Sequence, residues 1–261
     1  MRAVDEQTIL ITGSTDGLGK RVAQALAERG ARVVVHGRDR SKTEAAAGEV
    51  GAERAVVADL ASLDAVRGLA AEIEELDALV CNAGVYIPER SESQDGFELT
   101  FAVNYLSHFM LTELLVGKLP EPGRIVNVAS IGQRLVDFDD VMLERRYDGY
   151  TAYAQSKLAQ VLFTFELADR LGSSPTVNAL HPATLMDTKM VRESSGRALS
   201  SVEEGMEAVL QLVCDPELDG VTGRYFDGMS ESRAHEQAYD RGARRRLWEL
   251  SERLTGARFA L

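Results

Sequence analysis

Short β-branched runs alternate with amphipathic helical patterns throughout the 261 residues, and this alternation limits the fold more than any other feature of the sequence. The expected strands cover residues 8–12, 32–35, 54–58, 78–81, 124–128 and 176–180. The expected helices cover residues 18–29, 41–50, 63–75, 99–119 and 153–171, with one more near 202–214. Near-continuous apolar strands separated by helices are typical of a parallel sheet with helices on both faces. Because parallel crossovers are right-handed, we predict a doubly wound α/β sheet of the Rossmann type.

No long linker or internal repeat interrupts this pattern, so we predict one domain over residues 1–261. The least regular stretch is polar and glycine-containing, at about 185–201, beside the carboxyl edge of the sheet. It is either a loop that closes over a substrate or an irregular surface connection. Residues of about 231–256 form an Arg-rich C-terminal helical segment, which we interpret as a solvated amphipathic helix without chemistry.

The net charge of −12 and the pI near 4.9 make the average surface repel nucleic acid and anionic lipid. We therefore expect no nucleic-acid partner. Cys81 and Cys214 are too few for a disulfide framework or a metal cluster, and they suggest a reducing compartment. With no evident signal peptide or membrane span, we expect a cytoplasmic protein.

A glycine-rich turn joins the first expected strand to the first expected helix. It consists of Gly13, Ser14, Thr15, Asp16, Gly17, Leu18 and Gly19. Glycines at such a turn let the backbone approach a pyrophosphate, and the N–H groups that begin the helix attract its charge. The alternative is a tight turn without a ligand, but the position within a strand–helix–strand unit favours a dinucleotide.

The Gly-x-x-x-Gly-x-Gly spacing resembles the glycine motif of the short-chain dehydrogenase/reductase family. Further segments resemble the same family, in the same order along the chain: Asp59 with Leu60 beside it, Asn82-Ala83-Gly84 after a cysteine, Asn104, Ser130, and Tyr153-x-x-x-Lys157. Residues 101–112 and 156–163 resemble the branch that contains the retinol dehydrogenases and their bacterial relatives. The resemblance extends over nearly the whole chain.

This resemblance implies interconversion of a carbonyl and an alcohol by hydride transfer, with catalytic residues Asn104, Ser130, Tyr153 and Lys157. Lys157 lies one helical turn after Tyr153, where its charge would lower the pKa of the phenol. The family's pattern implies that Lys157 also binds the nicotinamide ribose, that Ser130 donates to the substrate oxygen, and that Asn104 holds a water linked to Lys157. The alternatives without a catalytic role are an exposed Tyr–Lys pair and a serine that caps its own turn.

The end of the second expected strand reads His36-Gly37-Arg38 and offers no carboxylate for a ribose 2′-hydroxyl. The guanidinium of Arg38 can bind a 2′-phosphate, so we expect NADP(H) as the preferred cofactor, with NAD(H) also accepted. The alternative is that Arg38 is a surface charge paired with Asp39. No metal is expected.

The family's Pro-Gly and its threonine five positions after the proline are altered here. Pro182 and Ala183 precede Leu185, whose backbone is expected to hold the carboxamide, and Thr188 stands one position late. The threonine contact is therefore in doubt. The expected cofactor-binding residues also include Tyr153 and Lys157.

Apolar candidates for the substrate pocket, Val85, Tyr86, Leu135, Phe138 and Met190, predict a hydrophobic ketone, aldehyde or secondary alcohol. Because family members commonly pair through the helices at 99–119 and 153–171, we expect a homodimer or homotetramer. The rival functions are a catalytically inactive NADP(H)-sensing protein on the same fold, and an epimerase or dehydratase.

Overall fold

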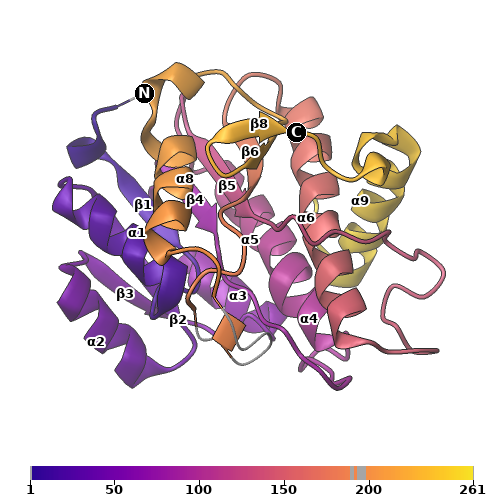
Figure 1. Ribbon diagram of the computed structural model, residues 1–261. Coiled ribbons are helices and arrows are strands. Elements are labelled where there is room, and N and C mark those ends of the chain that lie inside the picture. Colours follow the sequence, from indigo (N-terminus) through magenta and orange to yellow (C-terminus); the bar gives the residue numbers. More distant parts are fainter. Residues whose placement is uncertain (1, 189–190, 193–197, 261) are drawn as a thin grey trace.

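A single eight-stranded sheet runs through the computed structural model, which describes residues 2–188, 191–192 and 198–260 (Figure 1). The strand order is β3-β2-β1-β4-β5-β6-β7-β8, with every pair parallel except β7 and β8. The strands are β1 (Thr8–Ile11), β2 (Arg32–Gly37), β3 (Arg54–Val57), β4 (Ala78–Cys81), β5 (Arg124–Val128), β6 (Thr176–His181), β7 (Tyr225–Asp227) and β8 (Ser230–Ser232). The order reverses between β1 and β4, and ligands of such sheets bind at this point. The predicted doubly wound, single-domain fold is confirmed.

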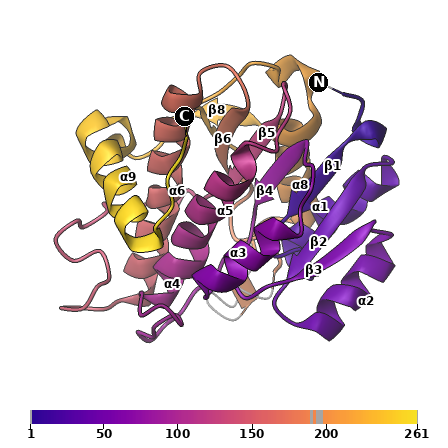
Figure 2. The ribbon, with the colours of Figure 1, turned by 180° about the vertical axis from the view of Figure 1, so that it is seen from behind.

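Helices cover both faces of the sheet. The principal ones are α1 (Gly17–Glu28), α2 (Arg40–Val50), α3 (Leu63–Ala71), α4 (Leu99–Phe101), α5 (Ser107–Val116), α6 (Gly149–Leu171), α8 (Val202–Cys214) and α9 (Arg241–Thr255). Short turns are η1 (Val4–Glu6), η3 (Pro216–Leu218) and η4 (Glu236–Tyr239). Figure 1 shows α1 and α8 on one face, and Figure 2 shows α3 and α5 on the other. Each face has its own apolar core, so the buried strands contribute side chains to two layers.

The helix expected at 153–171 begins four residues earlier, at Gly149. The carboxylate of Asp148 accepts a hydrogen bond from the backbone N–H of Thr151 at 2.8 Å, which is the usual geometry of a helix N-cap. Tyr153 therefore lies in the second turn of α6, where the helical backbone fixes its direction.

The helix expected at 99–119 is interrupted by a π-helical segment, η2 (Ala102–Leu106), between α4 and α5. Such bulges are frequent at functional sites, and this one contains Asn104. Leu99–Val116 is also long and apolar enough to cross a membrane, with a mean hydropathy of 1.3, but 78% of the segment is buried inside the molecule. Burial of this extent is the pattern of a core helix.

The C-terminal region is more than a solvated helix, because α9 packs against α6. Arg244 of α9 is buried and forms ion pairs with Glu166 and Asp169 of α6, and Trp248 and Phe259 join an aromatic cluster with α5 and α6. From residue 154 to 168 every residue of α6 is buried within the chain. The chain's own C-terminal segment therefore covers part of α6, one of the two helices that the sequence prediction assigned to a homo-oligomer contact, and the oligomeric state stays a prediction.

Candidate active site

The glycine-rich turn is shaped by close contacts that exclude a side chain. Gly13 and Gly17 have φ angles of +64° and +53°, in the left-handed region that favours glycine. A Cβ at Gly13 would lie 2.9 Å from the Cα of Ala83. A Cβ at Gly19 would lie 2.4 Å from the backbone oxygen of Gly13. The glycine-rich turn thus packs closely against the segment after β4, which is typical of a loop that binds a dinucleotide.

Among the described residues, no hydrogen bond occupies the backbone N–H groups of Thr15, Asp16 and Leu18. Three free N–H groups at the N-terminus of α1 form a cradle for an anion, which is the fit expected of a cofactor pyrophosphate. Ser14 has another task, because its N–H donates to His36 O at 2.9 Å and its hydroxyl donates to Ile11 O at 2.8 Å. We infer that Ser14 maintains the loop and that its neighbours provide the direct contacts.

Two neutral histidines anchor this loop, and sequence reasoning gave neither of them a role. His36 Nδ1 accepts from Gly13 N–H at 3.1 Å, while Nε2 donates to Ala58 O at 3.1 Å. His108 Nε2 accepts from the hydroxyl of Thr12 at 2.9 Å. Burial lowers the pKa of His36 to about 4 and that of His108 to about 3, so both rings stay neutral near pH 7. Each ring can therefore accept on one nitrogen and donate on the other.

The segment after β4 closes one side of the cradle. The hydroxyl of Thr12 accepts from the N–H groups of Asn82 and Ala83 at 2.9 and 3.0 Å, and Asn82 Nδ2 donates to Thr12 O at 2.9 Å. Gly84 follows beside the ammonium of Lys157, since a Cβ there would lie 3.6 Å from the Nζ atom.

Asp59 and Leu60 follow β3, at the same edge of the sheet. One carboxylate oxygen of Asp59 accepts from Ala61 N–H at 3.0 Å, and Leu60 is buried. Asp59 is half-buried, and its contact with an adenine stays a prediction.

The segment after β6 places Thr188 against the phosphate loop. A Cβ at Gly17 would lie 3.5 Å from the Cγ2 atom of Thr188, so the threonine reaches the loop despite its shift by one position. Pro182 and Ala183 lead into Leu185, which has a φ of +47° and is exposed. Met190 and part of the expected 185–201 loop lie outside the described residues.

Ser130 follows β5, and its backbone is held by two side chains. Its carbonyl oxygen accepts from Gln133 Nε2 at 2.7 Å and from the hydroxyl of Tyr225 at 3.1 Å. Its hydroxyl oxygen accepts from Gly132 N–H at 3.1 Å, as the turn-capping alternative predicts. This contact uses a lone pair and leaves the hydroxyl hydrogen able to donate, so the cap does not exclude the predicted donation to a substrate oxygen.

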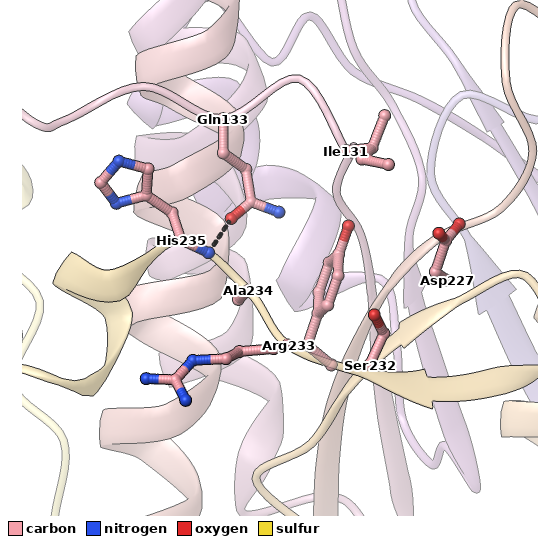
Figure 3. A pocket seen from close by; sticks show the side chains of 8 residues that line it. Ile131, Gln133, Asp227, Ser232, Arg233, Ala234 and His235 are labelled. Atoms are coloured by element: carbon pink, nitrogen blue, oxygen red, sulfur yellow. Dashed lines mark hydrogen bonds between the residues drawn. The ribbon is translucent and has the colours of Figure 1, made fainter.

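A pocket of about 290 Å³ lies beside this turn (Figure 3). Ile131 and Tyr225 line it, and Gln133 Oε1 accepts from His235 N–H at 2.9 Å across its wall. The short strands β7 and β8 that carry Tyr225 and Ser232 were missed from the sequence. β8 reads Ser-Glu-Ser, is fully exposed, and has no apolar pattern to reveal it.

Tyr153 and Lys157 lie together, with the Lys157 ammonium 5.6 Å from the centre of the Tyr153 ring. Lys157 is buried, and its Nζ atom donates to Val128 O at 2.8 Å and to Gln160 Oε1 at 2.9 Å. Burial raises the pKa of the half-buried Tyr153, and a hydrogen bond with Ser130 opposes this rise. Ser130, Tyr153 and Lys157 therefore meet at one point, as predicted.

The expected lowering of the Tyr153 pKa is not observed in the protein alone, where burial dominates and the pKa is raised. Burial also lowers the pKa of Lys157 to about 7, so near neutral pH much of the lysine is uncharged and stabilises a phenolate weakly. The four-residue spacing correctly predicts that Tyr153 and Lys157 lie close together. The spacing carries no information about the free-energy cost of burying their charged forms.

Asn104 joins two segments of the site. Its Oδ1 atom accepts from Val85 N–H at 2.7 Å, and its Nδ2 atom donates to Val85 O and to the Ser156 hydroxyl at 3.0 and 2.9 Å. The Ser156 hydroxyl in turn donates to the carbonyl of Tyr153 at 2.7 Å. Asn104 is thus a positioning residue for Tyr153, and its role in holding a water stays a prediction.

The expected pocket residues divide into two groups. Tyr86 faces the site, with its ring centre 6.1 Å from that of Tyr153, and Leu135 is exposed. Phe138 instead packs under the guanidinium of Arg246 from α9, at 4.8 Å. Sequence periodicity could not distinguish Leu135 from Phe138, because both lie in the same irregular segment between β5 and α6.

Comparisons with known proteins agree with this geometry. A family model described as short chain dehydrogenase matches residues 7–198. Retinol dehydrogenase 13 of Mus musculus is 40% identical, with 97% of this chain and 85% of that protein covered. Retinol dehydrogenase 13 of Homo sapiens is 41% identical, with 96% and 85% covered.

Solved structures show the same likeness in three dimensions. A protein from Mycobacterium paratuberculosis superimposes with a TM-score of 0.84 at 32% identity, covering 98% of this chain and 96% of that one. A blue fluorescent protein from a metagenomic library, solved with NADPH, gives a TM-score of 0.70 at 25% identity, with 87% and 99% covered. This chain therefore belongs to the short-chain dehydrogenase family and is an NAD(P)-dependent oxidoreductase.

Proposed function

We propose that the protein interconverts a hydrophobic carbonyl compound and its alcohol with NADP(H) as the preferred cofactor. The observation that carries this proposal is the meeting of Ser130, Tyr153 and Lys157 beside a glycine loop with three free N–H groups. The loop would hold the cofactor's phosphates, and the three side chains would surround the reacting carbonyl oxygen.

When bound, the nicotinamide cofactor supplies or accepts the hydride. During reduction, the carbonyl oxygen gains negative charge, which the hydroxyl of Ser130 stabilises by donating a hydrogen bond. The hydroxyl of Tyr153 donates the proton, and in the reverse direction the phenolate takes it back. A charged Lys157 lowers the free energy of that phenolate. Asn104, through Ser156, holds the turn of α6 that directs Tyr153.

The end of β2 supports NADP(H). A Cβ at Gly37 would lie 2.4 Å from Thr15 Cγ2 and 2.6 Å from Thr43 Oγ1, so the carboxylate side chain of an NAD-selective site does not fit there. Arg38 is exposed and forms no ion pair within the part of the chain that the structure describes, while Asp39 caps α2. A guanidinium without a protein partner at this position suits a 2′-phosphate. The metagenomic relative solved with NADPH is consistent with this preference.

Replacing Arg38 tests this preference. Arg38→Leu is expected to weaken NADPH binding by about tenfold or more, because charge-assisted hydrogen bonds contribute about 1.5–3 kcal/mol each. NADH binding should not change. Fluorescence titration with both nucleotides measures the two affinities. Arg40→Leu is the matched control, since Arg40 is two residues away and paired with Glu44. Equal losses for NADPH and NADH would show that Arg38 does not read the 2′-phosphate.

Exposed apolar side chains in the segments that follow β5 and β6 support a hydrophobic substrate. Ile131, Leu135 and Leu199 are 57%, 59% and 60% exposed, and they lie in the segments that follow β5 and β6. Tyr150 at the start of α6 adds a partly exposed ring. Several large apolar groups exposed around one site mark a surface that binds an apolar ligand.

A panel of carbonyl compounds tests the substrate class. With NADPH, we expect turnover of retinaldehyde and other lipophilic aldehydes and ketones, with much lower kcat/KM for small charged keto acids, because the latter bury no apolar surface. The loss of absorbance at 340 nm measures the rate. Ile131→Ser and Leu135→Ser should raise KM for the lipophilic substrates only. A protein that reduced only charged keto acids would contradict the proposed substrate class.

A further inference from the structure

Gln160 is a buried amide on α6, three residues after Lys157. Its Oε1 atom accepts from the Lys157 ammonium at 2.9 Å, and Val128 O accepts from the same ammonium at 2.8 Å. Gln160 is 1% exposed and Lys157 is 3% exposed, so water does not compete with either contact. Two of the three N–H groups of the ammonium are thus used by the protein, and one is left for a ligand.

The other titratable groups that face Lys157 do not carry negative charge near pH 7. Burial raises the pKa of the Cys81 thiol on β4 to about 12, and burial lowers the pKa of His108 on α5 to about 3. Tyr153 on α6 is a neutral phenol with a raised pKa. The carbonyl of Val128 and the amide of Gln160 are therefore the dipoles that stabilise the ammonium in this dry site.

Gln160 occupies this position at a free-energy cost. Its Nε2 atom is buried without a hydrogen-bond partner among the described residues, and an unsatisfied donor costs about 1–3 kcal/mol. Its backbone oxygen accepts from the hydroxyl of Thr164 at 2.8 Å, which fixes the turn. A leucine of similar volume would avoid the cost, because every residue of α6 from 154 to 168 is buried. An unfavourable polar group at such a position indicates a functional constraint.

We propose that Gln160 is a positioning residue that holds the ammonium of Lys157 against Val128 and sets how readily that ammonium keeps its proton. The proposal rests on the function proposed above, because the charge of Lys157 matters through Tyr153. It assigns the control of the pH at which the lysine supports proton transfer to a glutamine that acts through its contact with that lysine.

Two substitutions should shift Lys157 in opposite directions. Gln160→Leu removes an acceptor, which destabilises the charged form and lowers the pKa of Lys157 below the wild-type value. Gln160→Glu is nearly isosteric and adds a negative charge, which raises that pKa. We expect shifts of about one pH unit each. The glutamate variant also keeps the test decisive if the leucine variant does not fold.

The titration of Lys157 in the nucleotide-free protein measures these shifts directly. Lysine labelled with ¹³C at Cε gives few signals, because the chain has five lysines, and the Lys157→Met spectrum assigns the relevant one. Gln155→Leu is the matched control. Gln155 is also 1% exposed on α6, but its hydrogen bonds go to residues other than Lys157. Its Nε2 atom donates to Val141 O, and its Oε1 atom accepts from Asp137 N–H.

The rate profile provides the second readout. In Gln160→Leu, Lys157 is charged in a smaller fraction of the molecules, so the phenolate of Tyr153 is less stable. The acid limb of the pH–rate profile for alcohol oxidation should therefore move to higher pH. Gln155→Leu should lose stability without moving that limb. A Lys157 midpoint unchanged in both Gln160 variants would overturn the proposal and leave the proposed function standing. Absence of carbonyl reduction in the wild type would refute the proposed function, whereas the lysine titration would still test the contact.

Discussion

Tyr153→Phe is expected to lower kcat by about 10²- to 10⁴-fold, the range that a positioned general acid or base contributes. The phenylalanine ring keeps the packing against Tyr86 but has no proton to give to the carbonyl oxygen. Nucleotide affinity should be unchanged, because the glycine loop and the N-terminus of α1 are untouched. Steady-state kinetics with NADPH and a lipophilic aldehyde, together with nucleotide titration, separates the two effects.

Tyr150→Phe is the control for this experiment. Tyr150 lies on the same helix, 46% exposed at the mouth of the site, and its ring packs with Arg134. Loss of its hydroxyl should leave kcat near the wild-type value. If Tyr150→Phe lost as much activity as Tyr153→Phe, the assignment of the proton to Tyr153 would be wrong.

Lys157→Met should reduce both catalysis and cofactor binding. Without the cation the phenolate of Tyr153 is less stable, so kcat should fall by about 10²-fold or more. The ammonium has one N–H free for a ligand, and its loss should weaken nucleotide binding by about threefold to tenfold. Kinetics over pH 5–10 and nucleotide titration measure both effects.

The same substitution should stabilise the fold, and this outcome excludes misfolding as the cause of inactivity. The pKa of Lys157 is about 7 in the folded protein and 10.5 ordinarily, so the unfolded chain binds more protons between these values. Burial of Lys157 therefore lowers the free energy of unfolding of the wild type by its full amount below pH 7, and this loss of stability shrinks as pH rises toward 10.5. The melting temperature of Lys157→Met should exceed that of the wild type most at low pH. Lys118→Met, which removes bonds to Ala70 O and Ile73 O, should lower stability and leave kcat unchanged.

The central strands and the order of the motifs could be predicted from the sequence because both depend on local pattern. Buried parallel strands read as apolar runs, the glycine turn and Ser130 lie where a strand ends, and Tyr153 and Lys157 lie one turn apart within α6. Carboxyl ends of parallel strands share one edge of the sheet, so the convergence of these residues followed from the fold.

Features that depend on contacts between distant segments were not predicted. The charge states of Tyr153 and Lys157 follow from burial, which the four-residue spacing does not reveal. The packing of α9 on α6 includes the buried pair of Arg244 with Glu166, although the arginines of α9 suggested a solvated helix. Gln160 is hidden for the same reason, because an isolated glutamine in an apolar helix gives no signal until its neighbour is known.

Transfer of deuterium from [4,4-²H₂]NADPH, in which either C4 position delivers the label, to a lipophilic aldehyde tests the account most directly. The wild type should place one deuterium on the carbinol carbon for each NADPH oxidised, as read by mass spectrometry of the alcohol. Tyr153→Phe should bind the nucleotide with unchanged affinity and transfer almost no label in the same time. Equal transfer by both proteins, or none by the wild type with NADPH bound, would contradict the claim that Tyr153 completes a hydride transfer at this site.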